Sequence, residues 1–215
     1  MGVRCKDGII IGSEKIVASK MQLPTSDPRI WSVTKHIGIT GNGLVPDAKS
    51  LMYRGREECA QYEKMYGIKM PGNLLSDRLA QSVHLNTVYA GKRPYGTSVI
   101  LACWDALNGA TLWMIEPSGA CYEYYGCATG RGKQLCRNEV EKKNYREMSC
   151  EEALPHVTKI LLKAQEEMKE KKMQVEVGVL SEKTNWVHKV VDPAMMQGVV
   201  AQAQKEIEEE EMELS

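Results

Sequence analysis

The chain contains no phenylalanine, and its 28 basic side chains are balanced by 28 acidic ones, so its formal net charge is zero. Without a basic excess, we expect no binding to nucleic acid and none to an anionic membrane. The sequence also lacks a signal peptide, an N-x-[ST] site and an apolar run long enough to span a bilayer. Because phenylalanine is absent, tyrosine, tryptophan, methionine and leucine must fill the large volumes of the core.

The cysteines and histidines show no arrangement that would hold a metal. The seven cysteines include no CxxC pair, and the four histidines are scattered, with none at metal-ligand spacing from another ligand. An odd number of cysteines fits free thiols in a reducing compartment better than a disulfide framework. We therefore predict a protein of the cytoplasm and nucleus, with no cofactor and no metal.

A glycine turn between an extended run and a long helical pattern raises the question of a phosphate site. Residues 37–40 are β-type, Gly41-Asn42-Gly43 follow, and the helical pattern opens at Pro46 and Asp47. Phosphate binds bare N–H groups at a helix start. Pro46 has no N–H, and Asp47, the expected N-cap, adds a negative charge. Neither GxGxxG nor GxxxxGK[ST] is present, so we predict a close-packed connection instead of a nucleotide site.

The order of the predicted elements favours two packed sheets, each covered by helices. Extended runs at the start give way to two helices, then to a three-stranded meander, two further helices, a strand pair and a last helix that starts at Asp192-Pro193. The fold class expected is α+β, a four-layer αββα sandwich. We predict one domain, residues 1–204. Residues 205–215 form an acidic tail, which we expect to be disordered because its glutamates repel one another.

Five segments in this order match a known family: Arg4-Cys5-Lys6-Asp7-Gly8, Gly43-Leu44-Val45-Pro46-Asp47-Ala48-Lys49-Ser50-Leu51, Arg93-Pro94-Tyr95-Gly96, Glu116-Pro117-Ser118-Gly119 and Gly126-Cys127-Ala128-Thr129-Gly130. Together they resemble proteasome alpha-type subunits, most of all alpha type 3, over nearly the whole length. The resemblance implies the αββα fold of N-terminal nucleophile hydrolases. Family members normally begin with a gating tail, a QVEYA-type motif and a helix, whereas Met1 here falls within the first strand.

The resemblance also implies that this chain is not an enzyme. Catalytic members of the family use an N-terminal threonine with an acid and a lysine nearby. Aligned on the Asp7-Gly8 turn, this chain starts after the threonine position and carries Glu14 in place of the acid and Arg29 in place of the lysine. Arginine does not give up its proton in a protein. We therefore predict no catalytic residues. The alternative is a threonine protease subunit whose true N-terminus is absent from this sequence.

The function implied by the resemblance is that of a non-catalytic subunit of the outer alpha ring of the 20S proteasome. Its expected partners are other alpha subunits in a heptameric ring, the beta ring, and regulatory particles or other activators in ubiquitin-dependent protein degradation. In the family, activator C-termini enter pockets between alpha subunits. The positions that correspond to such a pocket are Arg29, Gly43, Leu44 and Val45, where the guanidinium would pair with a terminal carboxylate.

Overall fold

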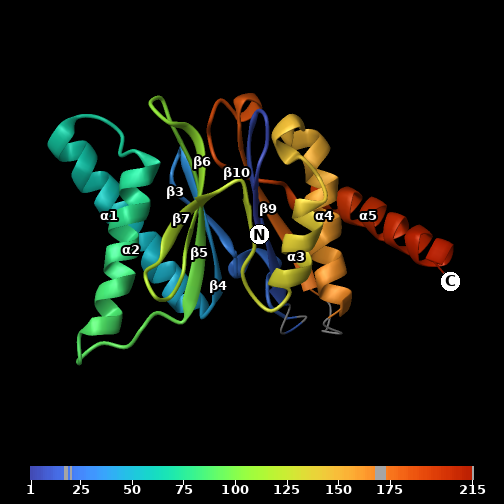
Figure 1. Ribbon diagram of the computed structural model, residues 1–215, viewed down its shortest axis with the longest axis horizontal. Coiled ribbons are helices and arrows are strands. Elements are labelled where there is room, and N and C mark those ends of the chain that lie inside the picture. The colour runs from blue at the N-terminus through green and yellow to red at the C-terminus, as the bar shows by residue number, and fades with distance from the viewer. Residues whose placement is uncertain (17–18, 20, 168–172, 215) are drawn as a thin grey trace.

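Two five-stranded sheets packed face to face form the middle of the molecule in this computed structural model, which describes residues 1–16, 19, 21–167 and 173–214. The first sheet has the order β10-β9-β2-β1-β8 and the second the order β3-β4-β5-β6-β7. Helices α1 and α2 cover the outer face of the second sheet, and α3, α4 and α5 lie on the other side, over the first sheet (Figure 1). The predicted αββα layer order is confirmed.

The first sheet is built mainly from the two ends of the described chain. Its strands are β1 (Gly2–Arg4), β2 (Gly8–Ile16), β8 (Gly126–Cys127), β9 (Met173–Ser181) and β10 (Lys189–Val190). Strand β2 pairs antiparallel with β9 from Gly8↔Ser181 to Ile16↔Met173. Strand β2 therefore continues without a break to Ile16, and residues 17 and 18 lie outside the described residues.

The second sheet is the predicted meander joined to the strands before α1. It contains β3 (Ile30–Thr34), β4 (Ile37–Gly43), β5 (Thr97–Asp105), β6 (Gly109–Ile115) and β7 (Cys121–Tyr124), each antiparallel to its neighbour. Helices α1 (Val45–Tyr66) and α2 (Gly72–Val88) separate β4 from β5. Gly67 ends α1 in the left-handed conformation, at φ 71°.

Three layers of apolar side chains hold these elements together. Ile9, Ile11, Ile100 and Leu112 fill the space between the two sheets. A second cluster lies between the β3–β7 sheet and helices α1 and α2, and a third lies between the β1–β2 strands and α4. As predicted, alternate strand residues thus face a core on both sides, since each sheet is covered twice.

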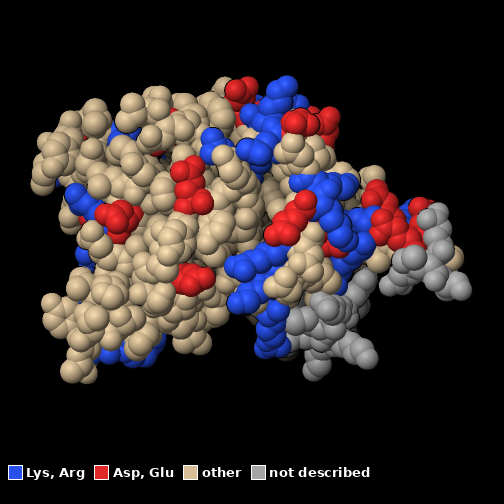
Figure 2. All heavy atoms as spheres, viewed as in Figure 1, with Lys and Arg blue, Asp and Glu red and all other residues tan. Residues whose placement is uncertain are grey.

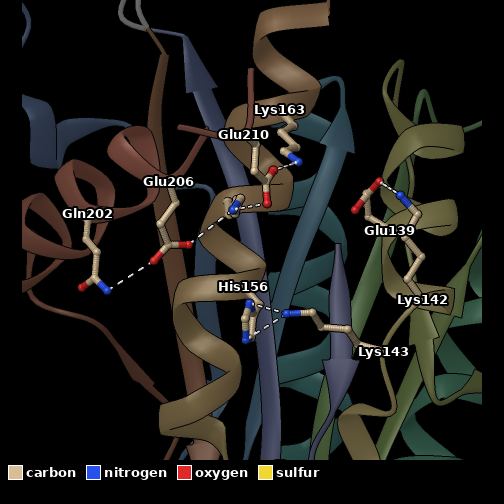
Figure 3. Close-up of polar contacts among 9 residues, drawn as sticks. Glu139, Lys142, Lys143, His156, Lys163, Gln202, Glu206 and Glu210 are labelled. Carbon is tan, nitrogen blue, oxygen red and sulfur yellow. Dashed lines mark hydrogen bonds and ion pairs between the residues drawn. The ribbon is translucent and has the colours of Figure 1, made fainter. Parts of the chain in front are cut away.

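The last helix differs from the expected disordered tail. Helix α3 spans Lys133–Glu141, α4 spans Cys150–Glu167, and α5 spans Pro193–Leu214, so the structure continues in helical form through most of the acidic segment. Ile207 of α5 is buried with Leu162 of α4. Glu206 and Glu210 reach Lys159 and Lys163, as Figure 3 shows for Glu210 and Lys163. These contacts define the α4–α5 seam, in which lysines of α4 offset the repulsion between glutamates.

Short turns connect several of these elements. In the described part of the chain, 3-10 turns lie at Pro24–Ser26, Tyr145–Glu147 and Glu182–Thr184.

Among the described residues, no helix combines the length and the apolar character needed to cross a membrane.

Candidate docking site

A cavity of about 330 Å³ opens where β2 and β4 end, between the two sheets. Strand β2 contributes Gly12 to Glu14, and the end of β4 contributes Thr40 to Gly43. The segment after β8 closes one side, and α4 supplies apolar side chains. The further lining residues are Met1, Ile16, Arg29, Ile100, Ala128, Thr129, Arg131, Gly132, Cys136, Leu161 and Ala164. Arg29 and Gly43, two of the four predicted site residues, therefore lie on the same cavity, whereas Leu44 and Val45 are not among its lining residues.

Arg29 is positioned by its backbone more than by its side chain. Its N–H donates to Glu176 Oε2 at 2.8 Å, and its carbonyl accepts from Thr40 Oγ1 at 2.9 Å. The Arg29 side chain is 19% exposed, and its guanidinium forms an ion pair with Asp27 at 3.2 Å. Its Nε is buried and has no hydrogen-bond partner among the described residues. Because a buried N–H without an acceptor is costly, Nε would gain from an acceptor group brought next to it.

Glu176 ties Arg29 to the first sheet. The same carboxylate that receives the Arg29 N–H accepts from Lys15 Nζ at 3.3 Å through Oε1. The Lys15 side chain is only 3% exposed, so its charge is buried beside that of Glu176. Glu176 lies on β9 and Lys15 on β2, while Arg29 precedes β3 in the other sheet. This arrangement fixes the backbone of Arg29 from across the sandwich, and no local sequence pattern predicts it.

The glycine turn is held tightly against the segment that precedes β5. Gly43 has φ 115°, and a Cβ at this position would lie 2.2 Å from the Gly96 carbonyl oxygen. That same carbonyl accepts the Leu44 N–H at 2.8 Å. The Leu44 side chain is exposed, whereas Val45 packs against the apolar cluster under α1. A docking ligand would therefore have to use peptide groups of this turn other than the Leu44 N–H.

Asp47 has a different role from the N-cap that the sequence predicted. Helix α1 starts at Val45 with Leu44 as its N-cap, and Asp47 lies in the first turn, only 6% exposed. Its carboxylate accepts two hydrogen bonds from Arg93, both at 2.7 Å, and one from the Gly96 N–H at 2.8 Å. The Arg93 hydrogen bonds lower the pKa of this carboxyl below its usual value, against the opposing effect of burial. We call Gly43, Asp47, Arg93 and Gly96 the Asp47 corner.

A second loop completes the site, and sequence reasoning missed its role. Asn42 donates from Nδ2 to the Thr129 carbonyl at 2.9 Å. Gly130 lies at φ 108°, and a Cβ there would come within 2.0 Å of the Asn42 amide nitrogen. Residues 126–130 carried the family resemblance, but the sequence alone did not indicate that this loop packs against the glycine turn after β4.

The two positions that we aligned with the family's catalytic acid and lysine from the sequence, Glu14 and Arg29, lie at the same cavity. Glu14 and Arg29 both line it, next to the buried Met1, whose amine donates to the Gly12 carbonyl at 2.7 Å. The guanidinium of Arg29 is engaged with Asp27. Among the described residues, no three His, Cys, Asp or Glu side chains come close enough to hold a metal ion. The described side chains thus form a partly charged recess suited to binding.

Comparison with known proteins decides the family. A family model described as "Proteasome subunit" matches residues 1–180. The chain belongs to the proteasome subunit family. It is 41% identical to proteasome subunit alpha type-3 of Arabidopsis thaliana, over 97% of this chain and 84% of the relative. It is 38% identical to alpha type-3 of Acanthamoeba castellanii, over 98% of this chain and 83% of the relative. It is 36% identical to alpha type-3 of Drosophila melanogaster, over 90% of this chain and 76% of the relative.

These relatives confirm three expectations from the sequence. The resemblance to the alpha-type subunits, and to alpha type 3 in particular, extends over nearly all of the chain. The αββα layers are those of the N-terminal nucleophile hydrolase type, as expected for a proteasome subunit. The alpha type is non-catalytic, so the chain is not an enzyme, and the alternative of a threonine protease subunit is disfavoured.

Proposed function

We propose that the chain is a non-catalytic structural subunit of the outer alpha ring of the 20S proteasome. It would assemble with other alpha subunits in a heptameric ring, stack on the beta ring and take part in ubiquitin-dependent protein degradation. The observation that carries this proposal is the likeness to alpha-type subunits over 97% of the chain, together with the αββα layers.

We also propose that the protein is in the cytoplasm and nucleus. Its seven free thiols, most of them buried, fit the reducing conditions there.

The test of assembly is co-purification. A chain tagged at its C-terminus and expressed at natural level should elute in a high-mass particle with other alpha and beta subunits in equal amounts. Mass spectrometry of the eluate gives the stoichiometry. A tagged chain that elutes only as a free monomer, while untagged alpha subunits enter the particle, would contradict the proposal.

We further propose that the Arg29 recess, the cavity lined by Arg29 and Gly43, receives the C-terminus of a regulatory particle or other activator. The buried Nε of Arg29, which has no partner among the described residues, supports this proposal. A terminal carboxylate at the guanidinium would form a charge-assisted hydrogen bond, the stronger kind in a partly buried site. The peptide groups around Gly43 would align the preceding residues of the activator tail, as in other cases where a chain terminus is captured by backbone groups.

This recess is tested by binding of a synthetic activator tail peptide to the assembled particle. Arg29→Ala should weaken binding about tenfold, as expected for loss of one charge-assisted hydrogen bond of about 1.4 kcal/mol. Amidation of the peptide C-terminus should have the same effect on the native particle and little further effect on the variant. Lys92→Ala, an exposed lysine beside Tyr89, is the matched control. Equal binding by the native and Arg29→Ala particles would rule out the recess as a docking site.

A further inference from the structure

A second recess, of about 130 Å³, lies among the helices that cover the first sheet, between α3, α4 and α5. In Figure 2 the Lys and Arg side chains gather on the half of the molecule where α3 and α4 lie, while the half formed by α2 and the second sheet is mostly uncharged. The recess is lined by four lysines, one histidine and three glutamates, together with Tyr145 and Ile160. The polar lining residues are Lys142, Lys143, Lys159, Lys163, His156, Glu139, Glu206 and Glu210.

The α5 side of this recess shows how it holds carboxylates. Glu210 accepts from Lys159 at 2.8 Å and from Lys163 at 2.6 Å, and Glu206 lies 3.4 Å from Lys159 (Figure 3). Hydrogen bonds from both lysines lower the pKa of Glu210 to about 2. Lysines one helical turn apart on α4 thus meet glutamates one helical turn apart on α5. The geometry fits an acidic helix laid against α4.

The α3 side carries more positive charge than the described carboxylates offset. Lys142 pairs with Glu139, but Lys143 Nζ points at the ring of His156, 2.8 Å from Nδ1 and 3.1 Å from Nε2 (Figure 3). In the part of the chain that the structure describes, this ring is the only polar side-chain partner of Lys143. Burial and the Lys143 charge lower the pKa of His156, so a cation faces a neutral imidazole. An anion placed between them would gain hydrogen bonds from both.

We propose that this open side, Lys143 and His156, binds an acidic helical segment of a partner protein, next to the glutamates of α5. Charge complementarity argues for the acidic class, and the α5 contacts show that helical glutamates fit these lysines. The pocket is small and ringed by flexible lysines, which suits carboxylates spread along a helix better than one enclosed small ligand. This recess shares no lining residue with the Arg29 recess, and the proposal does not depend on activator docking.

The test uses a labelled acidic peptide and the full chain. The probe is an acetylated and amidated helical peptide with glutamate at every fourth position, and its binding is followed by fluorescence anisotropy. We expect saturable binding that weakens with salt, and about a two- to fivefold loss of affinity in Lys143→Ala, the range expected for one exposed ion pair. Lys92→Ala, in the loop after α2, is the control and should bind as the native chain does.

A second variant gives the opposite sign. Glu210→Gln removes the carboxylate shared by Lys159 and Lys163, so two further lysines become available and peptide affinity should rise several-fold. Both variants change exposed side chains, and circular dichroism is used to check that each variant is folded. A peptide affinity that is equal in the native, Lys143→Ala and Glu210→Gln chains would overturn the proposal.

The last readout is the pKa of His156, followed by NMR during the peptide titration. The charged groups that face this ring are Lys143 after α3, Lys159 of α4 and Glu206 of α5. A bound carboxylate favours the imidazolium, so the pKa should rise on binding. A matched peptide with glutamine in place of glutamate should cause no rise. Equal binding of the glutamine peptide, or displacement of the acidic peptide by a tighter-binding RNA oligonucleotide, would rule out an acidic protein segment as the ligand.

Discussion

The Asp47 corner and the α4–α5 seam both join a helical carboxylate to cations, yet they hold the fold in different ways. The Asp47 side chain is 9% exposed, and its carboxylate accepts three hydrogen bonds, one of them from the Gly96 backbone. Glu210 is 48% exposed and meets lysine side chains. At the corner, the ion pair fixes the backbone beside the Arg29 recess. At the seam, ion pairs flank the apolar contact of Ile207, and solvent screens them.

The largest effect expected at either place comes from Gly43→Ala. Alanine is strained at φ 115°, and its Cβ would lie 2.2 Å from the Gly96 carbonyl oxygen, which is part of the backbone and has little room to move. We expect a loss of about 3 kcal/mol in the free energy of unfolding, measured by denaturant titration.

The control for this substitution is Gly67→Ala. Gly67 also has a positive φ, 71°, but apart from Gly67 itself and its chain neighbours no described residue has an atom within 4 Å of the position that its Cβ would take. Strain without a clash should cost about 1 kcal/mol. If the two variants lose equal stability, the close approach at the Asp47 corner contributes nothing.

The next effect is expected at the seam, from Ile207→Ala. Ile207 is 3% exposed and shares a small cluster with Leu162 and Ala203. Removing its side chain should cost about 2 kcal/mol, at the low end for a buried isoleucine because the cluster is small and lies at the surface. Hydrogen exchange should show faster opening of α5 with little change in α1. Uniform acceleration in both helices would mean that the seam is coupled to the whole fold.

Asp47→Ala ranks third, with an expected loss of about 1.5 kcal/mol at neutral pH. The Arg93 hydrogen bonds lower the pKa of Asp47 in the folded state from its ordinary value of 3.8. Its contribution is therefore present above about pH 4 and is lost as the pH falls through the folded-state pKa. Stability measured from pH 7 to pH 2 should fall less steeply in the variant. Parallel curves for the native and variant chains would contradict the depressed pKa.

The sequence predicted the layers better than the site. Burial places apolar or small residues at regular intervals along one element, every second residue in a strand and every third or fourth in a helix, as for Leu51, Gly55 and Cys59 of α1. Such intervals can be read from the sequence. The pairing of Asp47 with Arg93 joins residues far apart in sequence, so the prediction of Asp47 as a cap was wrong. The hydrogen bond between Glu176 and the N–H of the residue before β3 spans the two sheets and leaves no local pattern. These contacts depend on tertiary packing, which one sequence does not show.

The acidic end of α5 is a second case in which tertiary contacts are not visible in the local sequence. It is also where we predict the smallest change in stability. Like charges in residues 206–213 predicted disorder, because the lysines that offset them lie on α4, outside the local sequence. Glu210→Gln should cost only about 0.5 kcal/mol, since Glu210 is half exposed. The folded-state pKa is about 2 against an ordinary value of 4.5, so this contribution is present above about pH 4.5 and lost toward pH 2. High salt should remove most of the difference between the native and variant chains. This substitution keeps the helix and removes only the charge. If Glu210→Gln lowered the free energy of unfolding by more than Ile207→Ala does, and did so at any salt concentration, the polar contacts would hold the seam and its apolar centre would not.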